Sequence, residues 1–241
     1  MKKYMLFFAA IWMIVYFCSC DDGRIYEQKV DVQRGGRAMK LTGRFSGLSN
    51  WADGYSVVVA GFNGKSEYAV ITKSLPINVA DGTEIVMTLG GIGDDVTALK
   101  LCVISILREC VVDFKTIEDE ELAAVTDTIM MNVGTLDVGM YSTIQSQIFD
   151  KKCAICHGET GSASGGLFLT EGKSYHAIVN QPAHKNSDML LVKPGKAEES
   201  FLHLVLNRDG DTSMHHLDLF SEKEQLSLKL IDDWINDGAP E

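Results

Sequence analysis

The residues best suited to chemistry are 153–157, Cys-Ala-Ile-Cys-His, which form a CxxCH motif. Two thiols three positions apart at a helix end are spaced to add to the two vinyl groups of one porphyrin. The histidine that follows is then held beside the iron, where an imidazole nitrogen is a good axial ligand. The motif therefore predicts one covalently attached c-type haem, with Cys153 and Cys156 as its anchors and His157 as an axial ligand.

Two other chemistries use the same residue types. Zinc usually takes a second pair of ligands at short spacing, and the sequence has no second CxxC motif. A thioredoxin-like dithiol would lie in a βαβ pattern, which the surrounding residues do not show. All six histidines follow residue 150, so the residues with chemical potential are concentrated in the C-terminal part. Haem is the cofactor that this part of the sequence favours.

Residues 1–19 have the pattern of an export signal. Two lysines precede an apolar stretch, residues 5–17, which is shorter than the roughly 20 residues that a membrane-spanning helix needs. The stretch ends in Cys18-Ser19-Cys20, which resembles a bacterial lipobox because the small Ser19 precedes Cys20. We therefore expect a lipoprotein signal peptide and lipidation of Cys20, with simple cleavage or an uncleaved signal anchor as the alternatives.

The charged residues give information on the location of the protein and on its partners. The acidic pair after Cys20 resembles the surface-export signal of Bacteroidetes lipoproteins, which predicts a lipid anchor in the outer membrane, on its periplasmic or cell-surface side. The formal net charge of -11 repels phosphate backbones, so no nucleic-acid partner is expected. The same charge is consistent with a basic redox partner protein, and equally with an acidic protein that is simply soluble.

Cys102 and Cys110 belong to neither motif. In an exported protein a disulfide between them is permitted. On one continuous strand they would lie roughly 26 Å apart, so they can bond only if the chain turns near residues 107–109. Two buried apolar thiols are the reading that the sequence favours.

Residues 20–135 have the pattern of a β-structure. Runs rich in Val, Ile, Tyr and Thr alternate with turn signals. An Asn63-Gly64 turn between residues 55–62 and 67–72 predicts a hairpin. Six or seven short strands favour an all-β immunoglobulin-like sandwich as an N-terminal domain. The predicted strands are residues 28–33, 38–45, 55–62, 67–73, 84–89 and 99–114.

From residue 140 the pattern becomes helical. Ile144, Ile148 and Phe149 share one face of a helix that runs into Cys153. A capping-box signature at residues 221–224, Ser-Glu-Lys-Glu, predicts the start of a last helix. Its apolar face consists of Leu226, Leu230, Ile231, Trp234 and Ile235.

Residues 141–241 resemble the class I c-type cytochrome domain, in the short form found on exported proteins of Planctomycetes and Bacteroidetes. The matching pieces occur in order: Ile148-Phe149, the CxxCH motif, residues 165–169, Pro194-Gly195 and residues 231–239. The resemblance implies a second domain, residues 136–241 with a short linker, that has an all-α class I cytochrome c fold. In that family the first and last helices cross and close the haem cleft.

The same resemblance implies a distal methionine ligand in a loop before the last helix, where Met214 stands. The proline that usually follows this methionine is replaced by His215, so His215 and His216 are alternative ligands and an open site is a third possibility. The choice matters, because thioether ligation raises the potential of the iron whereas a second imidazole lowers it.

These observations predict an electron-transfer protein of the cell envelope, in which one covalent c-type haem shuttles one electron. It is a carrier more than an enzyme, because one-electron exchange needs neither a general base nor a substrate pocket. The alternatives are a haem enzyme or sensor with an open distal site, and a lipoprotein that binds a glycan or protein and in which the haem is secondary.

Overall fold

A computed structural model describes residues 36–125, 128–158, 163–207, 216–221 and 224–241. The predicted signal peptide, residues 1–19, and the predicted lipidation site, Cys20, lie outside these residues. Within the described part of the chain, no helix combines the length and the apolar character needed to cross a membrane.

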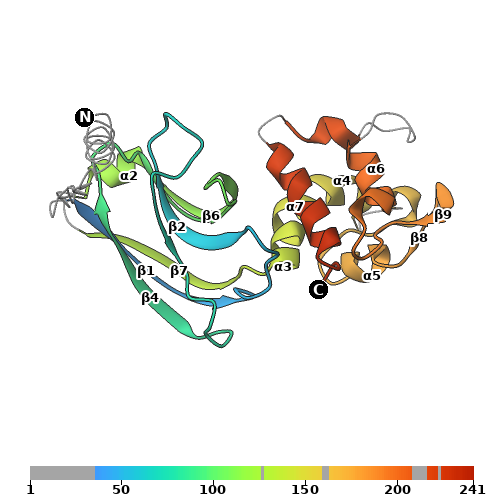
Figure 1. Ribbon diagram of the computed structural model, residues 1–241, viewed down its shortest axis with the longest axis horizontal. Helices are drawn as coiled ribbons and strands as arrows, with labels where there is room; N and C mark the ends of the chain where they lie inside the picture. Colours follow the sequence, from blue (N-terminus) through green and yellow to red (C-terminus); the bar gives the residue numbers. More distant parts are fainter. Residues whose placement is uncertain (1–35, 126–127, 159–162, 208–215, 222–223) are drawn as a thin grey trace, which may run out of the picture. The chain divides into compact units, whose positions relative to one another are not determined.

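Two sheets form the β-rich part (Figure 1). The first has the strand order β4-β1-β7; β1 pairs antiparallel with β4 and parallel with β7. The second has the order β3-β2-β5-β6 and is antiparallel throughout. The strands are β1 (Arg37–Ser46), β2 (Ser56–Phe62), β3 (Ile71–Ser74), β4 (Glu84–Ile92), β5 (Ala98–Ile104), β6 (Cys110–Glu118) and β7 (Thr128–Asp137).

The β2 strand shows how its sequence determines its position. Successive side chains of a strand point to opposite faces, so a strand covered on both sides is apolar throughout. Val57 and Val59 pack into a core cluster that also holds β1 residues such as Leu41, while Val58 and Ala60 pack into a second cluster on the other face. The near-continuous burial of β2 follows from this central place in its sheet.

The C-terminal part contains short helices and one small hairpin. A nearly continuous helical run leads to the CxxCH motif, and α7 closes the chain (Figure 1). The α-helices are α3 (Met140–Ile144), α4 (Ala154–His157), α5 (Ser174–Ile178), α6 (Phe201–Asn207) and α7 (Gln225–Asn236). The π-helix η1 spans Gln145–Cys153, and the 3₁₀ helices are η2 (Ser164–Gly166), η3 (Ala197–Glu199) and η4 (His216–Leu219).

The last helix agrees with its sequence pattern. The Glu224 carboxylate accepts a hydrogen bond from the Ser221 backbone N–H, which is one half of the predicted capping box. The other half does not form: the Ser221 hydroxyl also donates to the Glu224 carboxylate, and α7 begins at Gln225 with Glu224 as its N-cap. Leu230, Ile231 and Trp234 are fully buried on one face. The helix ends where Gly238 takes a φ of 95°, a left-handed conformation that glycine adopts without steric cost.

The predicted fold class is wrong. We expected two domains, an all-β immunoglobulin-like sandwich and an all-α class I cytochrome c fold. The described residues instead cluster as one unit of mixed architecture. Its C-terminal part is not all-α, because β8 (Pro182–Ala183) and β9 (Asn186–Leu190) form a two-stranded sheet. Its β-rich part contains the helix α2 (Asp119–Ala123) and the parallel β1–β7 pair.

Two local predictions also need correction. The β2–β3 pair is antiparallel, but β3 begins at Ile71, so the connection is longer than the predicted Asn63-Gly64 turn. Residues 99–114 form two strands and not one. The chain reverses between β5 and β6, where Arg108 takes a φ of 67° and its backbone N–H bonds the Ser105 carbonyl at 2.8 Å.

Candidate functional site

The CxxCH motif lies at the C-terminal end of the run α3–η1–α4. Ile144, Ile148 and Phe149 are at most 2% exposed, as their spacing predicts, and they hold the run against the core. The segment that contains Ile148, Phe149 and Cys153 is π-helical, a geometry that is frequent at functional sites. The helix core therefore determines where the two thiols and His157 lie.

The segment after the motif folds back onto it. The backbone N–H of Leu169 donates to the carbonyl of His157 at 2.8 Å. The buried side chain of Gln145 donates to the Leu169 carbonyl at 3.0 Å and to the Asp150 carboxylate at 2.7 Å. These bonds tie residues 163–169 to the helical run, so that Leu167 and Leu169 face the same space as His157.

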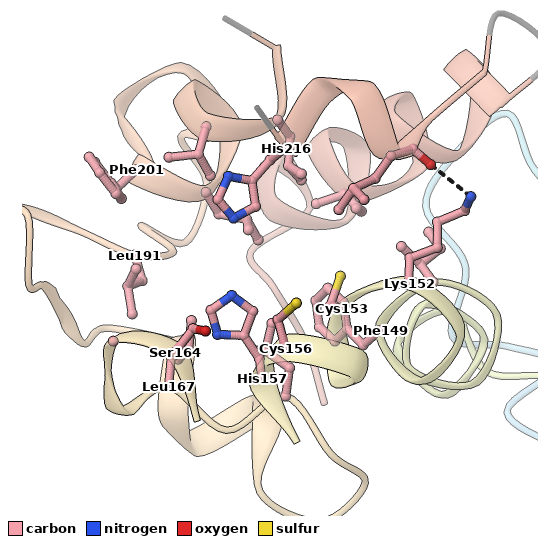
Figure 2. A pocket seen from close by; sticks show the side chains of 18 of the residues that line it. Phe149, Lys152, Cys153, Cys156, His157, Ser164, Leu167, Leu191, Phe201 and His216 are labelled. Atoms are coloured by element: carbon pink, nitrogen blue, oxygen red, sulfur yellow. Dashed lines mark hydrogen bonds between the residues drawn. The ribbon is translucent and has the colours of Figure 1, made fainter. Parts of the chain in front are cut away.

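That space is a cavity of about 440 Å³, within the range of small-molecule and cofactor sites. Cys153, Cys156 and His157 line one side of it, and His216 projects from the other (Figure 2). Most of the wall is apolar, from Ile148, Phe149, Leu167, Leu169, Leu191, Phe201, Leu202, Val205, Leu206, Leu219, Phe220 and Ile231. A cavity with this wall fits a large apolar ring.

The two histidines face each other across the cavity (Figure 2). The ring centres of His157 and His216 are 6.3 Å apart, and the ring planes differ by 25°. Two imidazoles that bind one metal ion through bonds of about 2 Å place their ring centres about 6 Å apart. A porphyrin would supply four nitrogens to an iron bound here, and the two imidazoles would supply two more. The pair therefore fits haem iron.

Several polar atoms of the motif have no partner among the described residues. His157 Nδ1 is buried, and no residue in the described ranges bonds it. The thiols of Cys153 and Cys156 are unpaired, and burial raises the pKa of Cys153 to about 11. Among the described residues, no cluster of three or more His, Cys, Asp or Glu side chains is placed to hold a metal ion.

The structure places the predicted site residues as follows. It brings together Cys153, Cys156, His157 and the alternative distal ligand His216. The predicted distal ligand Met214 and the alternative His215 lie outside the described residues.

Three basic residues of the cavity wall were not predicted as site residues. His184 and Lys185 lie between β8 and β9 and line the cavity. No periodicity marks so short a hairpin. Lys152 was also missed, although it directly precedes Cys153 in the sequence.

Lys152 connects the two sides of the cavity. Its ammonium group donates to the Leu219 carbonyl of η4 at 2.9 Å (Figure 2) and lies 5.1 Å from the centre of the Phe220 ring. It also pairs with Glu224 at 2.7 Å. Because η4 begins at His216, these contacts hold the histidine-bearing turn against the helix that carries the CxxCH motif.

Replacing Lys152 by methionine is expected to lower the free energy of unfolding by about 1 kcal/mol at neutral pH. Hydrogen bonds from Lys152, and then from Ser221, lower the pKa of Glu224 from 4.5 to about 2. A carboxylate with a lowered pKa stabilises the fold above its unfolded pKa and loses this contribution as the pH falls towards its folded pKa. The difference between wild type and Lys152→Met should therefore shrink between pH 4.5 and about 2.

Denaturant unfolding across this pH range measures the effect. Lys151→Met is the matched control, because Lys151 is exposed and its bond to Gln147 stays within η1. An equal loss of unfolding free energy in both variants would contradict the role given to Lys152. So would a difference between wild type and Lys152→Met that does not change with pH.

Comparison of the chain with protein-family models, with curated proteins and with solved structures returned no match. The class of site is therefore defined by the CxxCH motif, the facing histidines and the apolar cavity between them.

Proposed function

We propose that the protein is a haem-binding electron carrier, with one c-type haem attached through Cys153 and Cys156. The observation that carries the proposal is that His157 of the CxxCH motif faces a second histidine, His216, across an apolar cavity at a ring separation of 6.3 Å. The resemblance of residues 141–241 to c-type cytochromes supports the same cofactor. The proposal does not depend on the fold of that family.

Each residue of the site has a distinct role in this proposal. The two thiols form thioether bonds that keep the cofactor from dissociating. His157 is the proximal ligand, and His216 is the distal ligand in place of Met214. When bound, haem supplies reversible one-electron exchange at its iron. The apolar wall limits the access of water to the cofactor. The exclusion of water and the identity of the two imidazole ligands both influence the reduction potential of the iron.

The pair of imidazoles favours a carrier over a haem enzyme or sensor. If His157 and His216 both bind the haem iron, no site on the iron would remain for a substrate or a diatomic ligand. Imidazole at both positions also predicts a lower potential than a histidine–methionine pair would give. The Met214 and open-site alternatives are decided by the experiments below.

The proposed location is the cell envelope. Export, lipidation at Cys20 and anchoring in the outer membrane, on either side, are inferred from residues 1–22. The charge of -11 favours a basic redox partner protein, because opposite charges speed the encounter of transient partners.

Carbon monoxide tests the carrier against the enzyme and the sensor. The protein is purified from a host that matures c-type cytochromes, reduced, and exposed to carbon monoxide while its absorption spectrum is recorded. We expect no spectral change on mixing for the wild type, and rapid binding to His216→Ala as the control. Rapid binding to the wild type would contradict the carrier and support an open distal site.

A further inference from the structure

Cys102 and Cys110 lie close together in the second sheet. The reversal between β5 and β6 pairs Cys110 with Ile104 and Cys102 with Asp113, and the register shifts within this stretch. Cys102 and Ile104 share one face of β5, because they are two residues apart. Both thiols therefore border the same apolar cluster, in which Cys102 is a core member and Cys110 packs against it.

The two thiols differ in access. Cys102 is fully buried. Cys110 is partly exposed and lines a cavity of about 540 Å³ together with Lys100 and Asp113. This cavity is distinct from the one that contains the facing histidines, with which it shares no residue. A small disulfide compound can therefore reach Cys110 but not Cys102.

The thiols also differ in acidity. Their mutual hydrogen bond lowers the pKa of Cys110 and raises the pKa of Cys102, and burial raises that of Cys102 further. Burial opposes this effect at Cys110, Lys100 lowers the pKa of Cys110 as well, and Asp113 raises it. Because the thiolate is the nucleophile, Cys110 is the more reactive of the two.

We propose that Cys102 and Cys110 form a thiol–disulfide exchange pair, in which the accessible Cys110 attacks a low-molecular-weight disulfide and the buried Cys102 resolves the product. The Cys110 thiolate displaces one thiolate from the small disulfide and forms a mixed disulfide. The Cys102 thiol then loses its proton and attacks Cys110 Sγ, which releases the second thiolate. Two protein thiols are oxidised to one disulfide, and one small disulfide is reduced to two thiols.

The sequence offers a direct readout. Trypsin cleaves after Lys100, Arg108 and Lys115, which separates Cys102 in residues 101–108 from Cys110 in residues 109–115. The full-length protein is reduced, incubated with oxidised glutathione, blocked with an alkylating agent and digested. We expect the two peptides as one linked species, lighter than their sum by two hydrogens. Free thiols at both positions, or glutathione that stays on Cys110, would overturn the proposal.

Single serine variants assign the two roles. In Cys102→Ser we expect a stable mixed disulfide between Cys110 and glutathione, because the resolving thiol is absent. In Cys110→Ser we expect Cys102 to remain a free thiol, because glutathione cannot reach it in the folded protein. Modification of Cys102 in this second variant, with circular dichroism equal to that of the wild type, would contradict the order of attack.

Discussion

Replacing both Cys153 and Cys156 by serine is expected to abolish covalent haem attachment completely. In the proposed site each thiol would form one thioether bond, and both thiols line the same cavity as His157. Either single variant should keep one bond and therefore a reduced amount of haem. Haem staining after denaturing electrophoresis measures this directly, because denaturation removes any haem that is held only by the iron ligands.

The remaining cysteines of the described residues provide the matched control. Cys102 and Cys110 lie on β5 and β6 and line no part of the histidine cavity. Their double serine variant should therefore stain as strongly as the wild type. Haem that survives denaturation in the Cys153/Cys156 double variant would contradict the site. So would a loss of haem that is equal in the two double variants.

Replacing His216 by alanine is expected to convert the ferric iron from a low-spin to a high-spin state. His216 faces His157 at 6.3 Å between ring centres, so its removal leaves the distal side without the facing imidazole. Absorption and electron paramagnetic resonance spectra of the oxidised protein report the spin state. His216→Met should remain low-spin with a raised potential, because a thioether favours the ferrous state.

Two further variants test whether His216, and not a neighbouring residue, is the distal ligand. Met214→Ala should leave the spectra unchanged, and His184→Ala, which removes another histidine of the cavity wall, should do the same. If Met214→Ala produces the high-spin form and His216→Ala does not, methionine is the distal ligand and the proposed imidazole pair is wrong.

The sequence predicted the parts of the site that depend on local patterns. The stripe of Ile144, Ile148 and Phe149 specifies which side of the helix is buried, and therefore where the thiols at its end point. The face of α7 was predicted for the same reason, because amphipathic periodicity and a capping box are local signals. Predicting His157 as a site residue required only the spacing of the CxxCH motif.

The parts that depend on distant contacts could not be predicted. The position of His216 opposite His157 depends on how η4 packs, and Lys152 contacts η4 through the Leu219 carbonyl, 67 residues away. The parallel pairing of β1 with β7 joins segments about ninety residues apart, so no local pattern indicates it.

Short elements were missed for a different reason. The β8 strand has two residues, too few to show an alternation of apolar and polar side chains. The reversal at Arg108 was missed because arginine is an unusual residue at a positive φ, and this turn separates what the sequence presents as one apolar run. Placing Cys102 near Cys110 therefore required the structure.

The most direct test of the central proposal is the mass of the intact, denatured wild-type protein after expression with c-type haem maturation. We predict a polypeptide heavier by one haem, with the added mass located by digestion on the peptide that contains Cys153 and Cys156. A polypeptide that carries no haem, while a known c-type cytochrome from the same host carries its own, would contradict the proposal.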